Sequence, residues 1–267
     1  MEELHILGTG SAMVTNCYNT CFTISNNNEH FLIDAGGGNT ILSHLQKMNI
    51  KIENIHHMFI SHNHNDHILG AIWVLRAVGQ SMLNEKYTGN FNIYCHQTSI
   101  DALKDISRYV LQKKFTNLFD SRIIFNSINN GSKFTILNRE TEFFDIGSTK
   151  LLQFGFKTTL ENGKTLTFLG DEPYRDLVKS YALGVDYLLH EAFCLYSQKD
   201  IFKPYEKHHA TVKDACINAK ELNVKSILLY HTEDKNMENR EKLYIKEGQK
   251  EFNGPIYVPN DLTLITL

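Results

Sequence analysis

The run His62-Asn63-His64-Asn65-Asp66-His67 crowds three histidines and an aspartate into six consecutive residues. The segment His57–Ile60 ahead of it is typical of a strand, and the apolar spacing along Ile68–Met82 behind it predicts a helix. We therefore expect the run to form a strand-to-helix loop, in which side chains converge without a regular period. By chance, the pattern H-x-H-x-D-H would arise about once in a thousand chains of this histidine content, so it indicates a functional site.

A metal centre is the chemistry that this run favours. Imidazole and carboxylate groups together suit zinc, iron or manganese. His62 and His64 are two residues apart, so in extended backbone their side chains point the same way. Asp66 and His67 can then turn toward a second ion.

Three later segments also end in residues that can bind metal. Asp171 follows an apolar segment and Gly170, and a glycine lets the backbone come close. His231 and the pair His190-Glu191 each follow an apolar segment as well. We expect these strand ends to lie on one edge of the sheets, where a carboxylate such as Asp171 can bridge two ions. His190 itself is expected to be buried in the core.

The chain as a whole predicts a mixed α/β protein with several hairpins. Short apolar segments indicate strands at Leu4–Leu7, Cys21–Ile24, Phe31–Ile33, His57–Ile60, Phe91–Tyr94, Lys150–Phe156, Thr165–Leu169, Tyr187–Leu189 and Ser226–Leu229. Helical spacing indicates helices at Thr40–Met48, Ile68–Met82, Ser99–Leu111, Val212–Leu222 and Arg240–Phe252. No Pro-rich linker, low-complexity segment or repeat interrupts residues 1–267, so we expect a single domain.

Taken together, these pieces resemble the metallo-β-lactamase superfamily, and within it the ribonuclease Z-like branch. The matching pieces, in the order of the family, are Leu7-Gly8-Thr9-Gly10-Ser11-Ala12, Asp34-Ala35-Gly36, the H-x-H-x-D-H run, Gly170-Asp171, His190-Glu191-Ala192, His209-Ala210-Thr211 and His231. The resemblance spans nearly the whole chain. It implies a four-layer αββα sandwich with metals at the sheet edges.

The resemblance also implies a ligand set for two divalent metal ions. The ligands are His62 and His64 for the first ion, Asp66, His67 and His231 for the second, and Asp171 as the bridge between them. Zinc is the expected metal, with manganese or iron as alternatives. A bridging hydroxide would attack the substrate, with Asp66 orienting it.

His209 is expected to act on the substrate. It precedes Thr211, which together with Asp214 predicts a helix N-terminus, where anions are attracted. In the resembling enzymes the matching histidine contacts the substrate phosphate or the leaving group. His209 is therefore a candidate to stabilise charge or to protonate the leaving group. Lys207 is a candidate for substrate binding, and Glu191 for orienting His209 or a ligand histidine.

Two departures from the family pattern bear on the site. Gln153 stands where the family places a third histidine for the first ion, and a neutral amide oxygen is a weaker donor for such metals than imidazole. Water or another histidine, such as His96, is the alternative ligand. Only the 17 residues 154–170 separate Gln153 from Asp171. Ribonuclease Z that processes transfer RNA carries a protruding basic arm in this interval. In this chain the interval is too short to contain such an arm.

Composition limits the location and the partners. A net charge of −3 offers no basic excess for long nucleic acid. The five cysteines are odd in number and irregular in spacing, which favours reduced thiols packed in the core. The first residues lack the regions of a signal peptide, and no run approaches the ~20 apolar residues of a membrane span. We therefore expect a cytoplasmic protein with no membrane partner. The sequence leaves the oligomeric state open, and a homodimer is one alternative.

We expect a metal-dependent hydrolase and, by resemblance, a phosphodiesterase that acts on a small nucleotide or a short RNA. Two alternatives stay open. The fold does not fix the bond, so a thioester, a lactone or a sulfate ester is a second class of substrate. Because Gln153 stands in place of a ligand histidine, the other alternative is a binding or sensing protein with a degenerate metal site.

Overall fold

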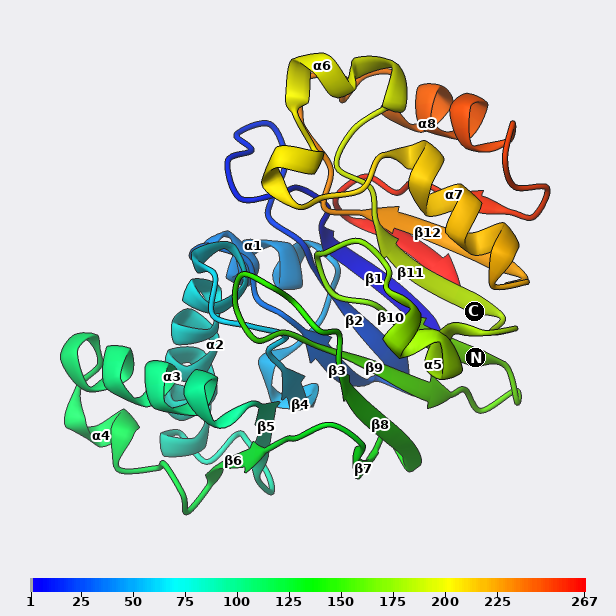
Figure 1. Cartoon of the computed structure of the whole chain (residues 1–267). Coiled ribbons are helices and arrows are strands. Elements are labelled where there is room, and N and C mark those ends of the chain that lie inside the picture. Colours follow the sequence, from blue (N-terminus) through cyan, green and yellow to red (C-terminus); the bar gives the residue numbers. More distant parts are fainter. Residues whose placement is uncertain (1) are drawn as a thin grey trace.

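The computed structural model describes residues 2–267 as two seven-stranded sheets that stack face to face, with helices on both outer faces (Figure 1). The first sheet has the strand order β14-β1-β2-β3-β4-β5-β6, and the second has the order β13-β12-β11-β10-β9-β8-β7. The chain fills the first sheet before it enters the second, and returns to the first only for its last strand. This arrangement confirms the expected four-layer αββα sandwich.

The elements have the following bounds. The first sheet contains β1 (Glu3–Gly8), β2 (Cys21–Asn26), β3 (Glu29–Ile33), β4 (Ile55–Phe59), β5 (Phe91–Cys95), β6 (Ile123–Ser127) and β14 (Thr263–Thr266). The second contains β7 (Ser132–Ile136), β8 (Arg139–Asp145), β9 (Phe154–Thr159), β10 (Thr165–Phe168), β11 (Tyr187–Glu191), β12 (Ser226–Tyr230) and β13 (Ile256–Tyr257). The α-helices are α1 (Thr40–Lys47), α2 (Asn65–Leu83), α3 (Gln97–Val110), α4 (Lys113–Thr116), α5 (Lys179–Ala182), α6 (Lys199–Phe202), α7 (Val212–Glu221) and α8 (Arg240–Gly248). Short 3-10 helices lie at Ile52–Asn54, Asp176–Val178, Tyr196–Gln198 and Tyr205–Lys207.

Three hydrophobic clusters hold the four layers together. The cluster between the sheets is rich in aromatic rings, such as Phe59 and Phe156, whose centroids lie 5.7 Å apart in an edge-to-face arrangement. Helix α2 packs on the outer face of the first sheet through residues such as Val74. Helices α7 and α8 cover the second sheet through Cys216 and Tyr244. Each sheet is therefore buried on both faces.

The carboxyl ends of several parallel strands meet at one edge of the sandwich, which we call the functional edge. In the first sheet, β3 and β4 are parallel neighbours. In the second sheet, β10, β11 and β12 are parallel neighbours in register. The loops that follow these strands carry the predicted site residues, so the expectation that they share one edge is confirmed.

The structure corrects two predicted boundaries. The expected strand Lys150–Phe156 is a strand only from Phe154, and the residues before it form a loop near the functional edge. The histidine run is only partly a loop, because α2 already begins at Asn65 with His64 as its N-cap. The other predicted strands and helices are present with ends shifted by a few residues. The sequence did not predict β6, β7, β8, β13, β14 or the short helices α4, α5 and α6.

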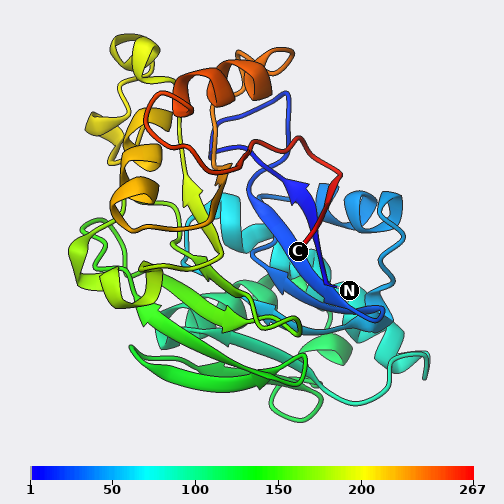
Figure 2. The same cartoon turned by 90° about the vertical axis from the view of Figure 1, so that its right-hand side faces the viewer.

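The last strand brings the two ends of the chain together. Strand β14 pairs antiparallel with β1, and Figure 2 shows the two ends side by side. Within residues 2–267, no helix combines the length and the apolar character needed to cross a membrane. All five cysteines are free thiols and four of them are buried, as expected.

Candidate metal centre

The first half of the centre forms where β4 leads into α2. The His64 backbone is extended (φ −63°, ψ 147°) and starts the helix. Helix α2 approaches the turn after β3 so closely that a side chain at Gly70 would collide with the Ala35 carbonyl. Ala35 N also donates to His67 O at 3.0 Å. This packing fixes the first turn of α2, and with it Asp66 and His67, against the end of β3.

Three predicted ligands, His62, His64 and Asp171, form the first group, with ligand atoms within 4.8 Å of one another. His62 Nε2 lies 2.8 Å from His64 Nδ1 and 3.5 Å from Asp171 Oδ2. Asp171 follows Gly170, whose left-handed backbone (φ 77°) favours glycine. Tyr230 OH donates to Gly170 O and ties this turn to the end of β12.

Asp66, His67 and His231 form a second group, again within 4.8 Å of one another. Asp66 Oδ2 lies 3.3 Å from His67 Nε2 and 3.5 Å from His231 Nε2. Asp171 Oδ2 lies 3.5 Å from both of these nitrogen atoms. One oxygen of Asp171 is thus equally near to histidines of both groups, which is the position a bridging ligand needs.

The buried polar atoms of the two groups fit metal ions. Asp171 Oδ1, His67 Nε2 and both ring nitrogens of His231 are buried and make no hydrogen bond within residues 2–267. Buried polar atoms without partners cost free energy, whereas divalent ions would bind them. Imidazole and carboxylate donors in this combination suit zinc, manganese or iron.

Burial and neighbouring charges give Asp171, Asp66 and His62 the protonation states that metal binding needs, whereas at His67 the effect of burial, which lowers the pKa, is outweighed by Asp66 and Asp34, which raise it. Burial alone would raise the pKa of Asp171, but the surrounding histidines, His62 foremost, hold it well below its usual range. Burial would raise the pKa of Asp66 as well, but the nearby His67 and His231 lower it by more. The pKa of Asp66 therefore also lies below its usual value. Burial lowers the pKa of His62 well below its usual value, despite the nearby Asp171 carboxylate. Ionised carboxylates and neutral imidazole are the forms that bind metal.

Asp34, at the end of β3, orients one of the ligands. Its Oδ2 accepts hydrogen bonds from His67 Nδ1 at 2.8 Å and from Ser61 Oγ at 2.7 Å, and its Oδ1 accepts from Ser61 N at 2.8 Å. The bond to Nδ1 leaves His67 Nε2 facing the centre. In metal sites, carboxylates outside the ligand set orient ligand histidines in this way. The sequence marks Asp34 only as part of a motif, and its contact with His67 is visible only in three dimensions.

Gln153 is fully buried beside the first group. A Cβ atom at Gly170 would lie 3.4 Å from Gln153 Oε1. The following residue, Phe154, donates its N–H to Ser61 O at 3.1 Å, directly before the histidine run. Both polar atoms of the Gln153 amide make no hydrogen bond within the described residues. The alternative ligand, His96, caps α3 with its side chain and joins no metal-binding group within residues 2–267.

His209 lies against the second group. Its ring centroid is 5.0 Å from that of His231, and burial lowers the pKa of His209 to about 3. His209 Nδ1 lies 3.6 Å from Glu191 Oε2, and Glu191 also accepts a hydrogen bond from Ala210 N. Burial raises the pKa of Glu191 well above its usual value. Glu191, His209 and His231 form a third group within 4.8 Å, so the expected link between Glu191 and His209 has a geometric basis.

The neighbouring histidines point elsewhere. His190 is fully buried, and its ring contacts Glu191 O at 2.6 Å and Asn218 Nδ2 at 3.2 Å, so it belongs to the core as predicted. His208 is exposed and does not line the site. The helix N-terminus after His209 is also present, because Thr211 and Asp214 form a reciprocal capping box.

A cavity of ≈ 340 Å³ opens over the centre, and Lys207, the candidate for substrate binding, lines it. Lys207 Nζ lies 4.8 Å from the ring centroid of Phe193, which stacks on His209. Lys150 and Met13 line the same cavity, although the sequence did not single them out. Lys150 comes from the loop before β9 and donates to Lys207 O. Both missed residues lie on irregular loops without a recognisable motif, so no periodicity could have found them.

Known proteins resemble this chain over its full length. Ribonuclease Z of Azobacteroides pseudotrichonymphae is 25% identical over an alignment of 303 residues that covers 98% of each chain. The metallo-β-lactamase fold protein YhfI from Bacillus subtilis superposes with a TM-score of 0.80 at 17% identity, covering 99% of this chain and 98% of that protein. The short form of human tRNase Z superposes with a TM-score of 0.76 at 19% identity, covering 99% and 98%.

A family match accompanies these similarities. Residues 2–253 match the family described as anti-Pycsar protein Apyc1. The match includes all the candidate metal-binding groups and the segment around His209. The fold, the ligand groups and these relatives agree on a ribonuclease Z-like metallo-hydrolase with the metallo-β-lactamase fold. The chain belongs to the family of the anti-Pycsar protein Apyc1.

Proposed function

We propose that this hydrolase is a phosphodiesterase that acts on a small nucleotide or a short RNA through a dinuclear metal centre. The observation that carries the proposal is the position of Asp171, whose Oδ2 lies 3.5 Å from histidines of both ligand groups. The names of the ribonuclease Z relatives point to the same class of bond in those proteins.

The first ion would be held by His62, His64 and Asp171, with Gln153 as a weak further ligand. The second would be held by the Asp66 group and share Asp171. When bound, two divalent ions would lower the pKa of a shared water toward neutrality, giving a bridging hydroxide, and would neutralise the negative charge of the substrate. Zinc is the expected metal, with manganese or iron as alternatives.

The chain's own side chains would bind and orient the phosphodiester. Lys150 and Lys207 bring two ammonium groups to the cavity wall, and neither pairs with a carboxylate within the described residues. Asp66 would orient the attacking water. His209, whose Nδ1 lies 3.6 Å from Glu191 Oε2, would contact the substrate oxygen or the leaving group. A cavity of ≈ 340 Å³ is near the lower end of the range for small-molecule sites, about 300–1,000 Å³.

Two cations beside a metal pair favour an anionic ester over a neutral one. A thioester or a lactone carries no charge for Lys150 and Lys207 to bind, whereas a phosphodiester does. Sulfate esters are also anionic and stay an alternative. A binding or sensing protein would not need a carboxylate placed between two ligand groups. The position of Asp171 between the two groups therefore supports an enzyme.

A substrate panel tests the proposal. The protein would be given bis(4-nitrophenyl) phosphate, 4-nitrophenyl phosphate, 4-nitrophenyl sulfate, a thioester and a lactone, each with zinc, manganese or iron. We expect the phosphodiester to be hydrolysed fastest, and a chelator to abolish the reaction. His64→Ala and Asp171→Ala should remain folded but lose metal and activity, while His208→Ala, the exposed neighbour, should keep both. Faster hydrolysis of a neutral ester, or metal content unchanged in both ligand variants, would refute the proposal.

A further inference from the structure

His231 differs from His62 and His67 in how its ring is held. His67 Nδ1 donates to Asp34 at 2.8 Å, and His62 Nδ1 lies 2.9 Å from Ser61 Oγ. Neither ring nitrogen of His231 makes a hydrogen bond within residues 2–267. Histidines that bind metal are usually oriented by a hydrogen bond to their other ring nitrogen. The direction of the His231 ring therefore depends on its backbone and on packing.

The backbone at His231 is itself in a conformation that needs support. His231 follows directly after β12 with φ 57°, in the left-handed region that favours glycine. The next residue, Thr232, is buried and is fixed by the segment that follows β1. Thr232 N donates to Thr9 O at 3.0 Å, and Thr232 O accepts from Ser11 N at 3.0 Å. The conformation of His231 is thus supported through the residue that follows it.

Arg240, the first residue of α8, binds the side chain of the same threonine. Its Nη1 donates to Thr232 Oγ1 at 2.6 Å and to Thr9 Oγ1 at 3.2 Å. Its Nη2 donates to Pro259 O at 2.6 Å and to Asn260 Oδ1 at 3.0 Å. The planar fork of one guanidinium therefore connects the ends of β1 and β12 with the segment that leads to β14.

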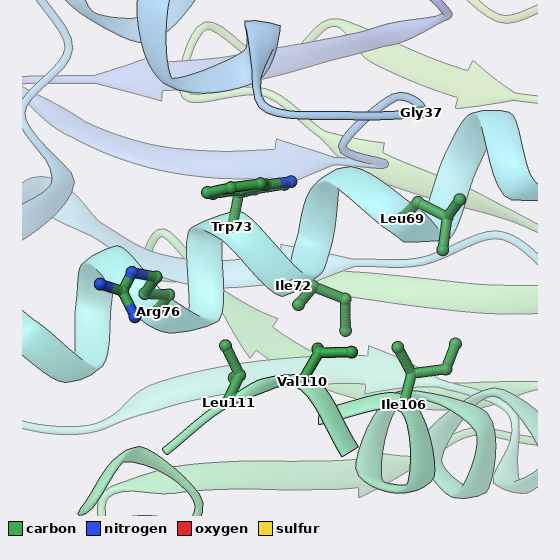
Figure 3. A pocket seen from close by; sticks show the side chains of 8 residues that line it. All are labelled: Gly37, Leu69, Ile72, Trp73, Arg76, Ile106, Val110 and Leu111. Atoms are coloured by element: carbon green, nitrogen blue, oxygen red, sulfur yellow. The ribbon is translucent and has the colours of Figure 1, made fainter. Parts of the chain in front are cut away.

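A guanidinium is costly to bury in this way. Arg240 is 0% exposed, and all four of its acceptors are neutral oxygens. A carboxylate is reached only through Thr9, whose Oγ1 donates to Asp261 Oδ1 at 2.8 Å. By contrast Arg76, which Figure 3 shows on α2 beside an apolar cavity, is exposed to water. A buried cation that binds no carboxylate directly contributes little to stability, so the use of Arg240 lies in the geometry of its bonds.

We propose that Arg240 is a positioning residue for the second metal ion: its guanidinium holds Thr232 and thereby aims the ring of His231 at the Asp66 group. This inference rests on the proposed function, because it takes His231 as a ligand of that ion. Arg240 does not line the metal cavity within the described chain, so it acts through Thr232. Lysine could supply the charge but not the fork, because an ammonium group is a single point.

Two substitutions of Thr232 test the link without removing the buried cation. Thr232→Val keeps the branched shape but offers no hydroxyl to Arg240, whereas Thr232→Ser keeps the hydroxyl. Each metal-free protein would be titrated with cobalt(II), by calorimetry and by visible absorption, which depends on the geometry of the ligands. We expect Thr232→Val to bind one ion about 10- to 100-fold more weakly, with an altered spectrum. This should be the ion that His231→Ala also loses. Thr232→Ser should bind both ions as the wild type does.

Arg240→Lys tests the fork itself. We expect it to weaken the binding of the same ion about tenfold or more, although it keeps a positive charge. Arg122→Lys is the matched control, because the guanidinium of Arg122 also binds neutral oxygens, those of Tyr87 and Gly89. These residues precede β5, whose start lies opposite the functional edge. Arg122→Lys should therefore leave both affinities and the spectrum unchanged. If Arg240→Lys does not fold, the two variants of Thr232 decide.

The outcomes separate this inference from the proposed function. Weak binding of one ion in Thr232→Val, with wild-type binding in Thr232→Ser and Arg122→Lys, sustains the inference even if no phosphodiester is hydrolysed. Equal affinities and spectra in Thr232→Val and the wild type would overturn it, even if bis(4-nitrophenyl) phosphate is hydrolysed. Equal weakening in Thr232→Ser and Thr232→Val would also overturn it, because packing rather than the bond to Arg240 would then hold His231.

Discussion

Asp34 and His231 both adopt left-handed backbone conformations at strand ends, with φ of 52° and 57°. Such conformations are uncommon for residues other than glycine and concentrate at functional sites, where the surroundings hold them. At Asp34 the hydrogen bonds to Ser61 and His67 provide that support. The strained turn therefore aims a carboxylate at the back of His67, a candidate metal ligand.

Asp34→Asn tests this role. Asparagine tolerates the same backbone conformation, but its amide nitrogen cannot accept from Ser61 or His67. We expect metal affinity to fall about 10- to 100-fold, which is typical for the loss of such an outer carboxylate. Calorimetric metal titration would measure it. Asp186→Asn is the matched control, because Asp186 accepts bonds from Thr165 at the opposite end of β10. Equal metal affinity in wild type and Asp34→Asn would contradict the role.

Gln153→His tests the strength of the first metal group. The first group has two histidines and the shared aspartate, whereas the second has Asp66 and two histidines besides that aspartate. Gln153 is buried next to the first group with both amide atoms free of hydrogen bonds. We expect the first ion to leave first on dialysis from the wild type, and to bind more tightly in Gln153→His.

Stepwise dialysis with elemental analysis, followed by anomalous diffraction, would show which site empties first. Two equally tight sites in the wild type, or no gain from the histidine, would mean that a different residue completes the first group.

At the residue scale, the sequence was sufficient to find the residues that cluster in the candidate metal centre, but not those of the cavity wall. His62, His64 and His67 could be found because they are close in the chain, and Asp171 and His231 because each ends an apolar strand. Lys150, Met13 and the acceptor role of Asp34 depend on loops whose path is set by tertiary contacts. Such contacts leave no periodic signal in the sequence.

Among the secondary-structure elements, the hairpin of β9 and β10 occupies the whole interval between Gln153 and Asp171. Its turn is closed by Leu160, whose N–H donates to Lys164 O at 2.7 Å. No arm extends from this interval, as the short spacing predicted. The interval therefore offers no protruding basic arm to a substrate that needs one for binding.

The hairpin leads to a prediction about transfer RNA. We expect no efficient, specific trimming of the 3′ end of precursor transfer RNA, because the arm is absent and the net charge is −3. A gel assay of labelled precursor would measure this, with bis(4-nitrophenyl) phosphate as the control for active enzyme. Accurate trimming at a rate typical of the processing enzyme would show the prediction to be wrong.

The elements that the sequence did not predict have weak patterns for physical reasons. Strand β7 lies at the edge of its sheet and carries Lys133 and Thr135 on its exposed positions, so its apolar signal is short. Strand β13 has only two residues. The strand β9 was predicted to begin early because Leu151 and Leu152 are apolar, although they lie in the loop. Apolar residues in a half-buried loop and in a strand look alike in sequence.

At the scale of the whole molecule, the centre joins the two sheets. His62, His64, Asp66 and His67 follow β4 of the first sheet, whereas Asp171 and His231 follow β10 and β12 of the second. Bound ions would therefore cross-link the two halves of the sandwich at the functional edge. Unfolding would separate the ligands and release the ions, so metal binding should add directly to the free energy of unfolding.

The thermal midpoint should consequently depend on metal. A ligand at a hundred times its dissociation constant adds about 2.7 kcal/mol to stability, and each kcal/mol shifts the Tm of a chain of this size by roughly 2–4 °C. We expect a chelator to lower Tm by about 5–10 °C and added zinc to restore it, as measured by calorimetry. Asp171→Ala removes the ligand shared by both groups and should respond much less. The same chelator response in Asp171→Ala as in the wild type would mean that the stabilising ions bind elsewhere, and that the two sheets are held by their aromatic core alone.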